Sequence, residues 1–198
     1  MARDEVKQMI IDKTRVLIQE KGAVTIKDIA EATNMNVAAV NYHFGSKDNL
    51  IQLVIFEVLN KLKQEIMERL ITLNETQDMD SFLFETLTLL YNFVVNNVGV
   101  TKYLFLSLDS QLLSANELIN SFFAENEFTE LVYKQLNLIM KTDDPKKLTT
   151  RYMIIFSSVV MPLLVQLLQG QEGVATMFTD PEFKEYYIND LLDLIKKQ

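Results

Sequence analysis

The residues best placed to do chemistry lie in residues 24–50, where polar side chains stand at the starts of expected helices. Thr25, Asn36 and Ser46 each carry a side-chain oxygen that can accept a hydrogen bond from a backbone N–H of a first helical turn. Lys47 follows Ser46 directly, so we expect its ammonium group beside N–H groups that no helical carbonyl pairs with. This arrangement suits the binding of a phosphate group.

Reactive side chains of other kinds are scarce. The chain has no Cys and a single His, His43, which excludes thiolate metal sites, multi-histidine metal sites and a Ser-His-Asp triad away from that residue. Ionisable residues within the apolar helices are few, and each is expected at the surface or in an ion pair: Glu85, Lys102, Asp109 and Arg151. We therefore expect no enzymatic activity, no cofactor and no bound metal.

The pattern around the capping residues predicts the helices that hold them. Thr25 and Asp28 stand at the spacing of a weak capping box. Val40 and Phe44, one turn apart, give the next helix a buried face, and Gly45 ends that helix where a left-handed residue is favoured. Short helices in this order are typical of a helix-turn-helix.

The second of these helices presents an outward face of mostly small side chains: Val37, Ala38, Ala39, Asn41 and Tyr42. Small residues let a helix backbone lie deep in the major groove of DNA, where base edges can be read. An ordinary helical hairpin in a larger bundle fits the same generic pattern, so the spacing alone leaves both interpretations open.

The chain as a whole predicts an all-α fold. It has 198 residues, 48% of them hydrophobic, with five Gly and three Pro, so it is long enough for a core and poor in loop-forming residues. A helix is expected over residues 3–21, and an unbroken pattern from Ser46 to about Leu73 predicts one long helix. We expect a three-helix helix-turn-helix head (residues 1–47), joined by the long helix to a C-terminal helical bundle (residues 48–198), with about nine helices in all.

Capping and helix-breaking residues set the expected boundaries in the C-terminal part. The predicted helices run from Asp80 to about Val98 with Gly99 as terminator, from Thr101 to about Leu108, and from Leu118 to Met140 with an irregularity near residues 124–127. Asp-Pro pairs at 144–145 and 180–181 place a capping carboxylate before a proline at the first helical position, so they predict the starts of the last helices.

The charge distribution separates the two parts of the chain. Residues 1–50 carry seven basic and seven acidic residues, and residues 51–198 carry twelve and twenty, which accounts for the formal net charge of −8. A neutral head can still bind nucleic acid through a few well-placed contacts. The acidic body should be repelled from phosphates and held away from them.

A more specific pattern lies within the same fifty residues. The segments T-x-x-D-I-A from Thr25 to Ala30 and Y-H-F-x-S-K-x-x-L from Tyr42 to Leu50, with an N-capped helix between them, resemble the tetracycline-repressor (TetR) family of transcriptional regulators. The motif covers about a quarter of the chain, and the length and all-helical remainder agree with the family. Many members have other residues where this chain has Asn34, Val37, Ala39 and Asn41, so the operator sequence does not follow from the resemblance.

The resemblance implies double-stranded DNA as a partner and assigns roles by position. Thr25, Tyr42, His43 and Lys47 match family positions that touch the phosphate backbone, whereas the base-facing positions are those of Val37, Ala38, Ala39 and Asn41. A dimeric protein of this kind reads a palindromic operator, because the symmetry of the dimer requires symmetry in the site.

Two features of the C-terminal part predict a homodimer through the two C-terminal helices. Residues 152–168 are uncharged, and a helix that is apolar all round needs a partner on more than one face. The last helix, residues 181–196, places Phe183, Tyr187, Leu191 and Leu194/Ile195 on one stripe, which we expect in the same interface. The uncharged run is short of a membrane span, and the start MARDEVKQ lacks the apolar core of a secretory signal, so a cytoplasmic protein without membrane contact is expected.

Phe, Tyr and Met are dense over residues 80–170. Aromatic residues at helical spacing are usually plain core, but as a group they also suit a cavity for a small apolar or aromatic effector. The residues chosen as its candidate lining are large and lie on helices that should converge: Tyr91, Phe105, Phe122, Met153 and Phe156.

The resemblance and the residues together favour a DNA-binding transcriptional regulator, a repressor that a small-molecule effector releases from its operator. A helical ligand-binding or carrier protein, in which residues 24–50 form only a hairpin, is the main alternative. An enzyme on a helical scaffold is the second alternative, and it requires clustered ionisable groups inside the apolar helices.

Overall fold

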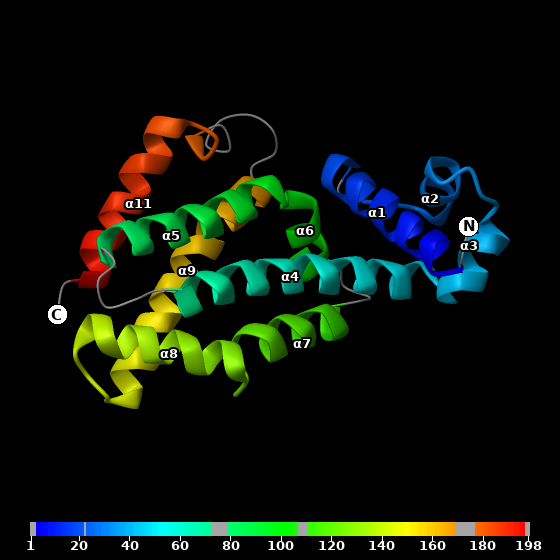
Figure 1. The fold of residues 1–198 in the computed structure, drawn as a ribbon. Coiled ribbons are helices and arrows are strands. Elements are labelled where there is room, and N and C mark those ends of the chain that lie inside the picture. Colours follow the sequence, from blue (N-terminus) through cyan, green and yellow to red (C-terminus); the bar gives the residue numbers. More distant parts are fainter. Residues whose placement is uncertain (1–2, 22, 73–78, 107–110, 169–176, 197–198) are drawn as a thin grey trace. The chain divides into compact units, whose positions relative to one another are not determined.

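The computed structural model describes residues 3–21, 23–72, 79–106, 111–168 and 177–196. Over these residues the protein is all-helical (Figure 1), which confirms the predicted fold class, with ten helices against the nine expected. The helices are α1 (Arg3–Lys21), α2 (Ile26–Ala32), α3 (Val37–Phe44), α4 (Lys47–Thr72), α5 (Met79–Asn96), α6 (Val98–Leu106), α7 (Gln111–Phe122), α8 (Glu127–Met140), α9 (Pro145–Leu168) and α11 (Pro181–Lys196).

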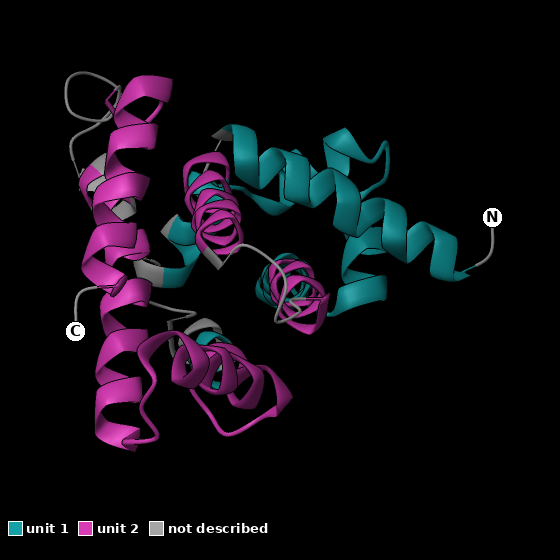
Figure 2. Cartoon of the chain, turned by 60° about the vertical axis from the view of Figure 1, so that its left-hand side comes forward, with its two compact units in different colours: residues 1–61, 97–120 teal, residues 62–96, 121–198 magenta. Residues whose placement is uncertain are grey.

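The chain forms two compact units (Figure 2). Unit 1 comprises residues 1–61 and 97–120, and unit 2 comprises residues 62–96 and 121–198. The predicted long helix is confirmed, because α4 runs over 26 residues without a break and enters both units. Unit 1 holds not only the three helices of the predicted head but also α6 and most of α7.

The core of unit 1 forms where α1 packs against α2 and α6, and α2 packs against α3. Its most deeply buried side chains come from all of these helices and from the start of α4, and they include Ile10, Ile18, Ile29, Val40, Leu50, Val54 and Val100. These aliphatic residues recur at helical spacing within each segment, so one face of every short helix is apolar. The burial of these faces fixes the short helices, which are too short to be stable alone.

The sequence predicted that Gly99 ends a helix, and this prediction is wrong. α5 ends at Asn96, and Gly99 lies inside α6. A Cβ atom at Gly99 would lie 1.9 Å from the carbonyl oxygen of Ile18 in α1, so only glycine allows the two helices to approach this closely. Gly99 therefore allows α1 and α6 to pack closely within unit 1, which its sequence neighbours do not reveal.

The predicted helix from Leu118 to Met140 is wrong in its extent, because two helices, α7 and α8, cover this region. The Asn126 side chain accepts hydrogen bonds from the backbone N–H groups of Phe128 and Thr129 at 3.0 and 3.3 Å. The backbone N–H of Asn126 in turn donates to Thr129 Oγ1 at 3.0 Å. This capping box stabilises a helix start at Glu127, within the stretch expected to be irregular. α7 begins at Gln111, before the predicted helix start at Leu118.

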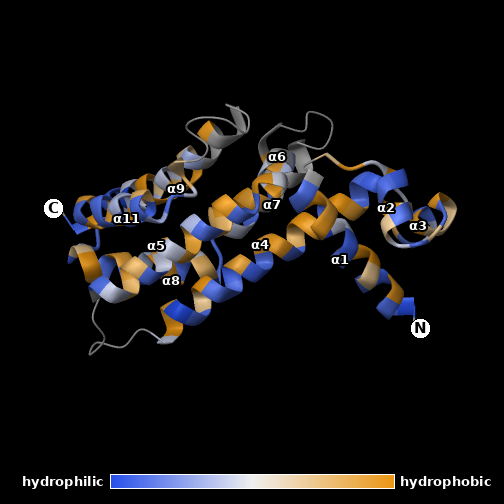
Figure 3. Ribbon diagram, turned by 90° about the horizontal axis from the view of Figure 1, so that it is seen from above, coloured by the Kyte–Doolittle hydropathy of each residue, from blue (hydrophilic) through white to orange (hydrophobic). Residues whose placement is uncertain are grey.

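In unit 2, α5 packs against α9 and α11, and α8 packs against α9. Both Asp-Pro predictions are confirmed: Asp144 Oδ1 accepts the Lys146 N–H at 2.9 Å, and Asp180 Oδ1 accepts the Glu182 N–H at 3.1 Å. Hydrophobic and hydrophilic residues alternate around these helices (Figure 3), as expected of helices that bury one face. Among the described residues, no helix is both long enough and apolar enough to cross a membrane.

The apolar stripe of α11 faces the interior of the chain, which corrects its assignment to a dimer interface. Leu191 and Ile195 are buried, and the Tyr187 hydroxyl donates to the Ser158 carbonyl of α9. Leu194, a member of the predicted stripe, is exposed, and so is Tyr186, which lies outside the stripe. The sequence pattern located an apolar face correctly, but intrachain packing against α5 and α9 already covers it.

Candidate nucleic-acid interface

The caps of three successive helices are formed as the sequence predicted. Asp28 N–H donates to Thr25 Oγ1 at 3.2 Å and Thr25 N–H donates to Asp28 Oδ2 at 2.8 Å, which completes the capping box of α2. Asn36 Oδ1 accepts the Ala39 N–H at 2.7 Å at the start of α3. Ser46 Oγ accepts the Asn49 N–H at 3.1 Å at the start of α4. Each cap satisfies one of the unpaired N–H groups at its helix N-terminus.

The turn between α2 and α3 is closed by backbone geometry. Asn34 has a φ of 53°, in the left-handed region that asparagine tolerates better than most residues. The Met35 N–H donates to the Ala30 carbonyl at 2.9 Å, which joins this connector to the end of α2. Glycine would fit this position for the same reason, because it adopts a left-handed φ at little cost.

Helix α3 presents the outward face that the sequence predicted. Val40 and Phe44 are buried against the rest of unit 1, while Ala38 and Asn41 are exposed. Val37 and Ala39 are half-buried. Gly45, with a φ of 78°, ends α3. A short capped helix with small exposed residues can enter a major groove without steric conflict.

The predicted phosphate-contacting residues lie around α3. Thr25 is exposed at the start of α2, and Lys47 is half-buried at the start of α4, with Nζ 3.7 Å from Asp48 Oδ1. Tyr42 is 73% exposed, and its ring contacts that of His43 at a centroid distance of 5.5 Å. The Nδ1 atom of His43 is buried without a hydrogen-bond partner in the part of the chain that the structure describes.

One further cation joins this surface. The guanidinium of Arg3 lies 5.7 Å from the centroid of the Tyr42 ring, a cation–π contact between the start of α1 and the end of α3. From the sequence, Arg3 and Lys7 could form a basic arm that reaches the DNA backbone or minor groove, with a solvated terminus as the alternative, but nothing local to residue 3 shows that α1 reaches α3. The basic charge of Arg3 near the N-terminus was the only available signal.

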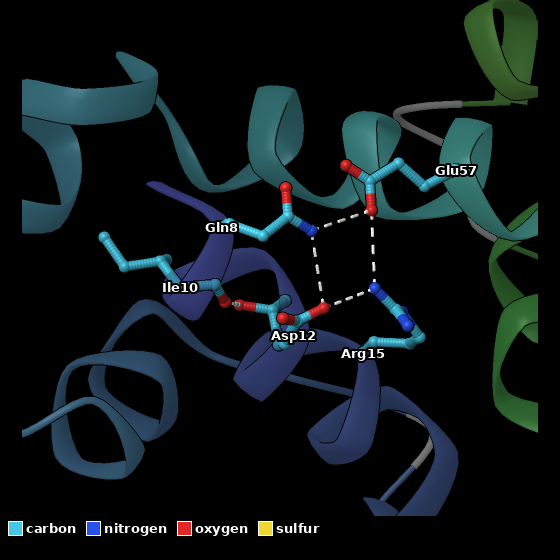
Figure 4. Close-up of polar contacts among 6 residues, drawn as sticks. Gln8, Ile10, Asp12, Arg15 and Glu57 are labelled. Atoms are coloured by element: carbon cyan, nitrogen blue, oxygen red, sulfur yellow. Dashed lines mark hydrogen bonds and ion pairs between the residues drawn. The ribbon is translucent and has the colours of Figure 1, made fainter. Parts of the chain in front are cut away.

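Two carboxylates of unit 1 are paired with the same arginine, Arg15 (Figure 4). Arg15 Nη2 contacts Asp12 Oδ1 at 2.5 Å and Glu57 Oε2 at 3.3 Å, and Gln8 Nε2 donates to both carboxylates at 3.4 Å. The side chains of these four residues link α1 to α4. Because Arg15 compensates part of the negative charge of Asp12 and Glu57, their repulsion of nearby phosphates is reduced.

Three of the predicted effector-lining residues lie together in unit 2. The Phe122 ring lies 6.5 Å from that of Phe156, and Phe156 shares an open surface hollow on α9 with Met153, which is 47% exposed. The side chain of Phe105 lies outside the described residues. Phe122 and Phe156 therefore belong to an aromatic cluster, with Phe123 and Tyr152 as further members.

Tyr91 belongs to a different cluster. Its ring lies 5.8 Å from that of Tyr187, and its hydroxyl donates to the Phe178 carbonyl at 2.9 Å. Burial, with smaller contributions from Tyr187 and Asp180, raises the pKa of Tyr91 to about 12. Burial also raises the pKa of Tyr152, whose hydroxyl donates to the Phe122 carbonyl at 2.6 Å. Both phenols are therefore structural hydrogen-bond donors at neutral pH.

No contact among the described residues brings together the ionisable residues considered for catalysis. Glu85 Oε2 pairs with Arg69 at 3.0 Å, and Arg151 donates to the Leu194 carbonyl. The side chain of Lys102 and all of Asp109 lie outside the described residues. Over the described chain, no group of three or more His, Cys, Asp or Glu residues is arranged to hold a metal ion.

Residues 10–54, which include α2, α3 and the start of α4, match the family model described as bacterial regulatory proteins, tetR family. No curated protein matches the chain. The matched segment contains every predicted DNA-contacting residue.

Solved structures of regulators share the fold over nearly the whole chain. A transcriptional regulator from a Rhodococcus species has a TM-score of 0.66 at 15% identity, over 98% of this chain and 96% of that one. A TetR transcriptional regulator from Legionella pneumophila has a TM-score of 0.59 at 23% identity, over 96% and 97%. A TetR variant from Acinetobacter baumannii, solved in complex with minocycline, has a TM-score of 0.56 at 16% identity, over 99% and 94%. The chain therefore combines a segment that matches the tetR family model, residues 10–54, with a fold that it shares with these regulators over nearly its whole length.

Proposed function

We propose that the protein binds operator DNA through α3 and represses transcription until a small molecule releases it. The observation that carries this proposal is the exposed face of α3, where Ala38, Asn41 and Tyr42 lie between the capped starts of α2 and α4. Asn41 offers an amide that can pair bidentately with adenine in a major groove. Thr25 and Lys47 lie at the two flanking helix N-termini, whose partial positive charges favour phosphate.

The proposal includes a homodimer. Large apolar side chains on α9 and α11 support it, because the described part of the chain leaves them exposed and a second subunit could cover them: Met153, Met161, Tyr186 and Leu194. A two-fold dimer places two copies of α3 on one DNA duplex. The operator would then be a palindrome with half-sites about 34–36 Å apart, or a multiple of that distance.

The effector is proposed to bind among the aromatic residues of unit 2, near Phe122 and Phe156. The bound minocycline of the Acinetobacter baumannii TetR variant supports an aromatic ligand by analogy.

Release from DNA requires that the effector bind one arrangement of the protein more tightly than the other. A shift from 1:99 to 99:1 needs about 5.5 kcal/mol of difference in binding free energy. Helix α4 is the proposed link, because it begins at Lys47 beside α3 and ends at Thr72 in unit 2. A ligand with equal affinity for both arrangements would change nothing.

The experiment that tests this function is selection of bound sequences from random duplex DNA by the purified protein. The expected result is an enriched palindrome, rich in A·T pairs at the positions facing Asn41. A protein with Asn41→Ala and Tyr42→Ala serves as the matched control and should enrich no such sequence. If the native protein enriches nothing over the control, DNA binding is excluded and the carrier interpretation takes its place.

A further inference from the structure

A pocket of ≈ 530 Å³ lies in unit 2 among the end of α8, the start of α9 and the end of α11. Its lining contains basic residues from all three segments: Lys141, Lys146, Lys147, Arg151 and Lys196. Among the described residues that line it, none is Asp or Glu. The pocket is therefore strongly positive in a body that is otherwise acidic, because five of the twelve basic residues in 51–198 gather there.

Helix stability explains only some of these cations. Lys141 caps the C-terminal end of α8 and Lys196 lies in the last turn of α11, where a positive charge interacts favourably with the helix dipole. Lys196 also pairs with Asp80 at 2.5 Å. Lys146 and Lys147 differ, because they lie in the first turn of α9, which contains no acidic residue and where the dipole disfavours a cation. The helix dipole therefore does not account for lysines at these two positions.

The pocket also has apolar and hydrogen-bonding parts. Ile139, Met140, Ile154 and Ile195 form its apolar lining, and Thr142 and Thr150 contribute hydroxyl groups. The Arg151 guanidinium donates to the Leu194 carbonyl, which holds its planar group at the pocket. A guanidinium held in this way loses less conformational freedom when it binds an anion.

We propose that this pocket binds a small organic anion, with its carboxylate beside Lys146, Lys147 and Arg151 and its apolar part against the isoleucines. Charge alone would favour any anion, but the apolar lining selects one that carries a hydrocarbon portion. Anion binding at this pocket does not require the proposed DNA binding, so the two proposals can be tested separately.

The test uses the full-length protein in titration calorimetry with three probes: octanoate, its neutral counterpart octanamide, and inorganic phosphate. Octanoate should bind saturably, at one per chain, and at least about tenfold more tightly than either other probe, since it alone matches both parts of the pocket. Equal affinity for octanoate and octanamide would show that the cations play no part, and would overturn the proposal. Phosphate binding as tight as that of octanoate would overturn the role of the apolar lining.

A pair of variants locates the site. Lys146→Gln with Lys147→Gln should weaken octanoate binding roughly tenfold or more, while the protein stays folded, because these lysines oppose the helix dipole. Lys134→Gln with Lys184→Gln removes the same charge from α8 and α11 outside the pocket lining, and should leave octanoate binding nearly unchanged. Equal affinities of the two double variants would place octanoate elsewhere and refute the assignment.

Discussion

The hydroxyl of Tyr103, on α6, accepts a hydrogen bond of 2.8 Å from the backbone N–H of Val24, the residue before the cap of α2. Both groups are buried, and the two residues lie 79 positions apart in the sequence. The contact ties α6 to the first helix of the helix-turn-helix. It satisfies a backbone donor that the short loop between α1 and α2 cannot satisfy by itself.

Tyr103→Phe should destabilise the protein by about 1–3 kcal/mol, because the Val24 N–H would remain buried without an acceptor. The free energy of unfolding in urea measures this loss. Tyr186→Phe removes the same hydroxyl from a side chain that is 66% exposed, and it should change the free energy by much less. Similar values for both variants would mean that the hydrogen bond contributes nothing to stability.

Gly99→Ala should lower the midpoint of thermal unfolding, although alanine favours helices over glycine by about 1 kcal/mol. The added Cβ would lie 1.9 Å from the Ile18 carbonyl oxygen, so α1 and α6 must separate, at a cost of about 1–3 kcal/mol or more. The direction of the change in the midpoint shows which of the two effects is larger. An unchanged or raised midpoint would show that the two helices part easily.

Lys47→Ala and Asn41→Ala should weaken DNA binding in different ways. Loss of Lys47 should lower the affinity for all sequences alike and reduce the dependence on salt concentration, because it removes a phosphate contact. Loss of Asn41 should cost about 1–3 kcal/mol on the operator and relax the preference at one base pair. Fluorescence anisotropy with operator and random duplexes at several salt concentrations separates the two effects, and equal losses on both duplexes for Asn41→Ala would refute base reading.

Met161→Glu should shift the protein toward monomer in sedimentation velocity. Met161 is 60% exposed on α9, so the change does not disturb the core of a subunit, but it would place an unpaired charge in the proposed interface at a cost of several kcal/mol. Leu138→Glu, at a residue 55% exposed on α8, is the matched control and should leave the dimer intact. A native protein that sediments as a monomer at micromolar concentration would end the dimer proposal.

Alkaline pH should destabilise the protein through its buried tyrosines. The pKa of Tyr91 is raised to about 12 in the folded state from 10.0, so its contribution is fully present below pH 10 and is lost as the pH rises toward 12. The loss for this residue is on the order of 2 kcal/mol. Titration of tyrosinate absorbance should show phenols that ionise well above pH 10, with one fewer in Tyr91→Phe. A titration curve unchanged by that substitution would contradict the assignment.

Local sequence information determined the helix starts. Thr25, Asn36, Ser46, Asp144 and Asp180 each accept a backbone hydrogen bond two or three residues later in the chain, so the donor and the acceptor are both visible in a short window. The outward face of α3 followed for the same reason, because Val40 and Phe44 are one helical turn apart and both are buried.

The sequence by itself therefore determined the all-α fold, the helix-turn-helix and the resemblance to TetR regulators, all of which rest on contacts between near neighbours. The tertiary structure alone decided that Gly99 packs inside α6, that the stripe of Leu191 and Ile195 is internal, and that Lys146 shares a pocket with Lys196. Each of these depends on groups from separate helices that meet in space. Helical periodicity shows that a face is apolar or charged, but only packing decides what that face meets.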